Sequence, residues 1–154
     1  MPVSIMAMQK ITIGTVLAVA VMGMVVSALG VLVATRTISN TGNVNAVGVG
    51  VYWDSGWTSE VSSIDWGALE PGVTTDVTIY VKNEGSMAVV LGMTAGNWNP
   101  ASASSYITLS WNRENYLLNS GSVVQAVLTL SVSSGVSGVT NFSFDIIITG
   151  IEHT

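Results

Sequence analysis

The apolar residues of the chain follow two different patterns. Residues 11–34 contain no charged residue, and a helix of this segment is long enough to cross a bilayer core of about 30 Å. From about residue 37 onward, apolar and polar residues alternate instead, for example at Val77, Ile79 and Val81. Alternation with many β-branched residues is typical of half-buried strands. The pattern therefore predicts one N-terminal hydrophobic helix followed by a chain of strands.

Turn-forming sequences such as Asn83-Glu84-Gly85 and Asn119-Ser120-Gly121 separate the alternating runs. The spacing predicts an all-β domain, an antiparallel β-sandwich of immunoglobulin-like or jelly-roll type with seven or eight strands. In one of these strands Val47, Val49, Val51 and Trp53 share a face. The expected strands lie near residues 37–41, 44–53, 62–66, 74–82, 87–95, 105–111, 123–132 and 141–150.

Three regions follow from these patterns. Residues 1–34 form a signal peptide or a transmembrane helix, residues 35–43 an N-terminal extension, and residues 44–154 the β-sandwich domain. Small residues near Ala34 suit a signal peptidase, whereas the length of the apolar run favours a retained anchor. Lys10 precedes the run, and the positive-inside rule then places the domain outside the cell. We expect an extracellular or cell-surface protein that contacts the membrane through its helix before processing.

Composition excludes several classes of function. The net charge of −5, with 8% charged residues, argues against a nucleic-acid partner. The chain has no cysteine and a single histidine, His153, so most transition-metal sites and most His- or thiol-dependent catalysis are not expected. We predict no enzyme, no catalytic residue, no cofactor and no metal site. The acidic residues Asp54, Glu60, Asp65 and Glu70 leave calcium binding open, although no calcium-loop motif joins them.

Two further features suggest contacts. Trp57 lies in a turn between Gly56 and Thr58 and is the best candidate for an exposed contact, with a glycan as one candidate partner. Trp53, Trp66 and Trp111 lie within strand patterns and are expected to fill the core. Asn141-Phe142-Ser143 is an N-glycosylation sequon, which requires Asn141 to lie at the exposed start of its strand.

The polar surface of the predicted domain consists mainly of Ser, Thr, Asn and Gly. Such a surface carries little charge to keep subunits apart, and edge strands with few lysines lack the usual protection against strand addition. This composition is typical of a protein that polymerises.

Several motifs give the chain a family resemblance over roughly residues 11–150. They are Asp65-Trp66-Gly67-Ala68-Leu69-Glu70-Pro71-Gly72, Val81-Lys82-Asn83-Glu84-Gly85, Asn97-Trp98-Asn99-Pro100, Leu109-Ser110-Trp111 and the run from Phe142 to Gly150. With one export segment and no cysteine, the chain resembles archaeal bundling pilins, which are relatives of the bacterial camelysin and TasA-type biofilm fibre proteins. It differs from type IV pilins, because Lys10 is followed by Ile11 where those proteins carry a small residue.

The resemblance implies an archaeal filament that assembles by donor-strand complementation, in which an N-terminal segment of one subunit completes a sheet of its neighbour. The candidate donor lies between Thr35 and Val51, with residues 40–43 as a hinge. Its assembly residues are Ile38, Val44, Val47, Val49 and Val51. The expected function is that of a structural filament subunit whose partner is another copy of itself. The alternative is a membrane-anchored cell-surface module that binds a surface protein or a glycan.

Overall fold

The computed structural model of the chain describes residues 38–154. The N-terminal hydrophobic helix expected at residues 11–34 lies outside these residues. Within the described part, one short 3-10 helix, η1 (Ala101–Ser105), interrupts the strands. No helix in this part of the chain is long and apolar enough to span a bilayer.

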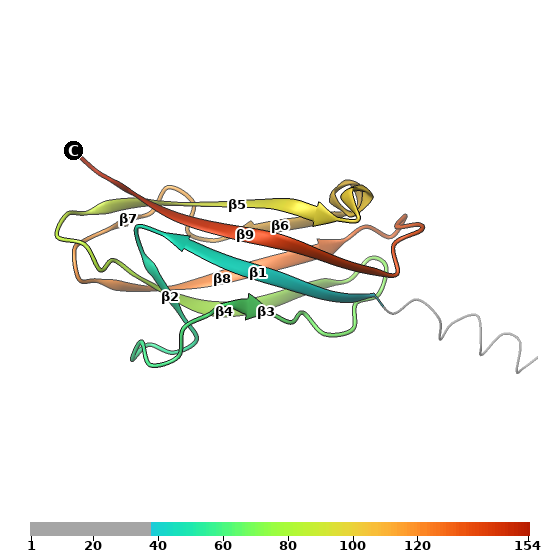
Figure 1. Ribbon diagram of the computed structural model, residues 1–154, viewed down its shortest axis with the longest axis horizontal. Helices are drawn as coiled ribbons and strands as arrows, with labels where there is room; N and C mark the ends of the chain where they lie inside the picture. Colours follow the sequence, from blue (N-terminus) through green and yellow to red (C-terminus); the bar gives the residue numbers. More distant parts are fainter. Residues whose placement is uncertain (1–37) are drawn as a thin grey trace, which may run out of the picture. The chain divides into compact units, whose positions relative to one another are not determined.

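The described residues form a sandwich of two sheets (Figure 1). The five-stranded sheet has the order β3-β1-β9-β5-β7, and the four-stranded sheet has the order β2-β4-β8-β6. The all-β, two-sheet prediction is therefore confirmed. The strands are β1 (Ser39–Val47), β2 (Gly50–Tyr52), β3 (Ser63–Ile64), β4 (Thr74–Lys82), β5 (Val89–Asn99), β6 (Ile107–Trp111), β7 (Leu117–Leu118), β8 (Val123–Val132) and β9 (Asn141–Glu152).

The described part thus has nine strands rather than seven or eight. The additional strand, β7, has two residues, which is too short for any alternation to be visible in the sequence. The long strands follow their sequence patterns closely. The alternating residues Ile79, Val81, Leu128 and Leu130 are fully buried between the sheets. Burial of each such side chain contributes about 1.5–3 kcal/mol, so these strands supply much of the core energy.

One pairing differs from the expected antiparallel arrangement. β1 and β9 run side by side in the same direction, in register from Ser39–Asn141 to Val47–Thr149 (Figure 1). The other paired strands are antiparallel. A tight turn requires antiparallel neighbours, but most of the domain separates β1 from β9, so no turn constrains their direction. The prediction of a wholly antiparallel sandwich was wrong at this position.

The strand expected at residues 44–53 is divided between the two sheets. β1 ends at Val47, and Gly48 has a φ of 75°, a conformation that favours glycine. A Cβ atom on Gly48 would lie 2.5 Å from the carbonyl oxygen of Gly150, so the two backbones are in close contact here. The chain then enters β2 in the other sheet. The change of direction is therefore at Gly48, and the hinge expected at residues 40–43 was wrong, because these residues lie inside β1.

Candidate functional site

β1 forms a complete hydrogen-bond ladder with β9 along one edge and only a very short ladder with β3 along the other. Nine residues of β1 pair with β9, whereas β3 pairs only at Gly42 and Asn43. Ile38, the residue before β1, exchanges two backbone hydrogen bonds with Leu69, of 2.9 and 3.2 Å. We define the β1 site as the part of the domain against which β1 lies, namely strand β9 and residues 62–69. Its buried side chains include Trp66, Phe142, Phe144 and Ile146. This site positions the first described strand of the chain.

The expected donor residues do not form one strand face. Ile38 and Val44 are buried in the β1 site, with exposed fractions of 3% and 9%. Val47 lies at the end of β1 and is exposed, whereas Val49 follows the turn at Gly48 and is buried. Val51 is fully buried in β2, which belongs to the four-stranded sheet. The β1 strand also crosses the domain boundary that was expected between residues 43 and 44.

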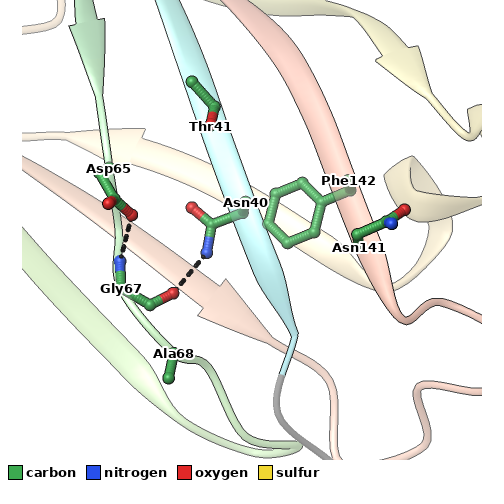
Figure 2. Close-up of a pocket in the computed structure, with 7 residues that line it drawn as sticks. All are labelled: Asn40, Thr41, Asp65, Gly67, Ala68, Asn141 and Phe142. Atoms are coloured by element: carbon green, nitrogen blue, oxygen red, sulfur yellow. Dashed lines mark hydrogen bonds between the residues drawn. The ribbon is translucent and has the colours of Figure 1, made fainter.

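Asn40 is a buried polar residue of the β1 site whose role could not be predicted from the sequence. It is buried and bonds two backbone groups of the loop after β3. Its side-chain amide donates to the Gly67 carbonyl oxygen at 3.0 Å, and its Oδ1 accepts from the Trp66 N–H at 3.2 Å (Figure 2). The Asp65 carboxylate accepts the Gly67 N–H at 2.9 Å and supports the same loop. The sequence did contain one signal for this role: an asparagine stands among the alternate, buried positions Ile38, Asn40, Gly42 and Val44.

Gly42 lies against three side chains of the β1 site. A Cβ atom there would lie 3.0 Å from Ile146 Cδ1, 3.2 Å from Trp66 Nε1 and 3.3 Å from Phe144 Cζ. The Trp66 Nε1–H is buried and has no hydrogen-bond partner among the described residues. The Phe144 ring is in turn stacked on Trp98, with a centroid distance of 4.3 Å and an interplanar angle of 5°. A side chain at this position would therefore require these neighbours to shift by a few tenths of an ångström.

A pocket of about 480 Å³ opens beside the start of β1 (Figure 2). Segments that are far apart in the sequence line it, which is why the sequence alone did not reveal it. Asn141 is exposed at the first position of β9, while the next residue, Phe142, is buried. The asparagine of the sequon is thus accessible, and its glycosylation remains a prediction. The lining residues are Asn40, Thr41, Asp65, Gly67, Ala68, Asn141 and Phe142.

Asp54 organises a second feature, the loop of residues 53–60. Its carboxylate accepts backbone N–H groups from Gly56, Thr58 and Ser59 at 2.8–3.2 Å, and the Thr58 hydroxyl at 3.0 Å. These bonds, chiefly the one from the Thr58 N–H, hold the pKa of Asp54 below its ordinary value. In the adjacent strand the Tyr52 hydroxyl donates to Glu84 at 2.7 Å, and this bond raises the pKa of Tyr52.

The loop presents Trp57 at its surface. Trp57 is 47% exposed, has a φ of 58°, and lies with its ring under Lys82, whose Nζ is 3.6 Å from the ring centroid. Trp53 is 40% exposed, so its assignment to the core was wrong; β2 ends at Tyr52, and the alternation stops there. Trp66 is buried and Trp111 packs against the core, as expected. The loop therefore carries two exposed indole rings.

The acidic residues do not converge in the described part of the chain. Between residues 38 and 154, no three carboxylate or imidazole groups lie close enough together to hold a metal ion. Asp54 and Asp65 instead accept hydrogen bonds within their own loops. His153 is exposed near the end of the chain, and its backbone N–H donates to the Ala88 carbonyl at 2.9 Å.

The comparisons with known proteins give structural similarity but no family. No family model matches the chain, and no curated protein matches it. Among the solved structures, the ASH/PapD-like domain of human CEP192 (PapD-like domain 7) is similar at 10% sequence identity, with a TM-score of 0.34. The alignment covers 78% of this chain and 87% of that one.

Proposed function

We propose that the chain is a structural subunit of an extracellular filament, in which the β1 segment of one subunit occupies the β1 site of the next. The observation that carries the proposal is the parallel pairing of β1 with β9. β1 is the first described strand, and the Gly48 turn separates it from the remainder of the sandwich. Such a strand can be exchanged between copies of a chain with its contacts conserved, which makes exchange a low-cost route to assembly.

The geometry favours an open chain of subunits. The start of β1 and the C-terminus lie at opposite ends of the sandwich, because β1 and β9 run in the same direction (Figure 1). Each subunit would donate a strand at one end and accept one along β9. A head-to-tail contact of this kind forms a filament unless the rotation between subunits closes it into a ring.

The surface is consistent with polymerisation. Between residues 38 and 154 the sequence contains two basic residues, Lys82 and Arg113. Both lie over aromatic rings, Lys82 over Trp57 and Arg113 over Tyr116 at 5.0 Å. The edge strands β2, β3, β6 and β7 contain no lysine. They therefore lack the charged side chains by which monomeric proteins discourage strand addition.

Disulfide trapping between two single-cysteine variants tests the exchange, since the native chain has no cysteine. Thr41 and Ser143 are register partners in β1 and β9, and adjacent strands are close enough for a disulfide. We expect cells that express Thr41→Cys subunits together with Ser143→Cys subunits to form a mixed, disulfide-linked dimer. A chain that carries both substitutions should give a ladder of covalent oligomers.

The matched control uses Thr78 and Val127, which are register partners in β4 and β8. These strands remain within one subunit in the proposal, so the corresponding mixture should give no mixed dimer, and the double variant should remain a monomer. The proposal is wrong if the Thr41/Ser143 pair behaves like this control, with an internal disulfide in the double variant and no mixed dimer.

A cell-surface module that binds a glycan is the second candidate function. The exposed indole rings of Trp53 and Trp57 favour it, because aromatic rings can stack against sugar rings. This function predicts that Trp57→Ala abolishes binding to immobilised cell-surface glycans and leaves strand exchange unchanged. Equal glycan retention of the native chain and of Trp57→Ala would remove this candidate.

A further inference from the structure

Asn40 and Gly42 are two inward-facing residues of β1 that meet different parts of the β1 site. We propose that the β1 site selects its donor strand by the pattern Ile38-x-Asn40-x-Gly42-x-Val44, which a second copy of this chain supplies. The inference rests on the strand exchange proposed above and adds to it the residues that determine which strand is accepted.

Asn40 supplies the polar part of this recognition. Its Oδ1 accepts a hydrogen bond from the backbone N–H of Trp66, and its Nδ2 donates one to the Gly67 carbonyl oxygen. Both backbone groups lie in the loop after β3, beyond the residues that pair with β1. A donor with an apolar residue at this position would leave the buried Trp66 N–H without an acceptor, which is a costly defect in a buried site. An aspartate would accept from the Trp66 N–H, but it could not donate to the Gly67 carbonyl.

Gly42 supplies the steric part. Three atoms of Ile146, Trp66 and Phe144 lie within 3.3 Å of the place where a Cβ atom would be. Because Phe144 is stacked on Trp98, its ring has little freedom to move away. Overpacking a buried site is destabilising, so the β1 site disfavours a donor that carries a side chain here.

Together these two positions also determine the register. Successive side chains of a strand point to opposite faces, so a shift by one residue would place Thr41 or Asn43 in the core. A shift by two residues would bring the side chain of Asn40 or Val44 onto the crowded position that Gly42 occupies. The observed register therefore satisfies the polar and the steric requirement at once.

The test introduces changes into donor and acceptor separately, with the mixed disulfide between Thr41→Cys and Ser143→Cys subunits as the readout. Adding Gly42→Ala to the Thr41→Cys subunit should lower the yield of mixed dimer about tenfold or more. Adding Ile146→Val to the Ser143→Cys subunit removes the Cδ1 atom and should restore much of the yield. The same Ile146→Val change in the Thr41→Cys subunit should not restore it, because that subunit is the donor.

A second pair of variants tests the polar requirement. Asn40→Asp in the donor should also lower the yield, whereas Asn45→Asp, at an exposed position of the same strand, should leave it unchanged. If Gly42→Ala and Asn40→Asp donors form the mixed dimer as well as the native donor does, selection by this pattern is wrong and strand exchange stands. If the native pair forms no mixed dimer, the proposed function itself fails.

Discussion

Replacement of Asn40 by alanine removes the polar contact that holds β1 to the loop after β3. The side chain makes two hydrogen bonds, to the Trp66 N–H at 3.2 Å and to the Gly67 carbonyl at 3.0 Å. A hydrogen bond of this kind contributes about 0.5–1.5 kcal/mol, and a buried group left without a partner costs about 1–3 kcal/mol. We therefore expect Asn40→Ala to lower the free energy of unfolding by about 2–4 kcal/mol.

Asn45→Ala is the matched control, because Asn45 lies on the same strand with its side chain exposed. It should change stability by less than about 0.5 kcal/mol. Urea unfolding of the purified chain, followed by tryptophan fluorescence, measures both variants. With a denaturant dependence of about 1–3 kcal/mol per molar urea, Asn40→Ala should lower the unfolding midpoint by roughly 1 M or more. Equal midpoints for the two variants would refute the role assigned to Asn40.

Three further predictions concern the turn after β1 and the Trp57 loop. Gly48→Ala should destabilise the chain clearly more than Gly138→Ala, as measured by urea unfolding, because both glycines have a positive φ but only Gly48 has a close neighbour. Lys82→Gln should lower stability by about 0.5–1 kcal/mol and change the fluorescence of Trp57, since it removes the cation above the indole ring; no change in either would contradict the contact. Hydrogen bonds lower the pKa of Asp54 in the folded state, so its carboxylate stabilises the folded chain. This stabilisation is complete above the pKa of the unfolded chain, about 3.9, and is lost as the pH falls through the lower pKa of the folded chain. In an NMR titration the amide signals of Gly56 and Thr58, which bond Asp54, should therefore move mainly below that ordinary value, and a main movement near pH 5–6 would be the opposite result.

The long strands were predictable because their burial repeats every second residue. β4 and β8 have the limits that the alternation predicts, 74–82 and 123–132, since their apolar residues face the core without interruption. β1 was harder to predict, because its central residues Asn40-Thr41-Gly42-Asn43 have the composition of a turn. Their strand conformation comes from the ladder with β9, about a hundred positions away in the sequence. Tertiary pairing here overrides the local preference.

The same limit applies to the candidate site. Ile38 and Val44 could be identified because they are apolar residues in an alternating run, and both are buried in the β1 site. The role of Asn40 could not be identified, because it depends on backbone groups of a loop 26 and 27 residues further along the chain. Trp53 was misplaced for a related reason: the apolar alternation continues to it in the sequence, but the strand ends one residue earlier.

In the proposed filament, the strand beside β9 comes from a neighbouring subunit. Electron cryomicroscopy of filaments sheared from the cell surface tests it most directly, because the density around Gly48 shows which chain each β1 continues into. We expect each β1 to lie in the β1 site of the adjacent subunit, with Gly42 over Trp66 of that subunit, and to connect through Gly48 to β2 of its own subunit. Density that returns at Gly48 to β9 of the same subunit, as in the single chain, would contradict it.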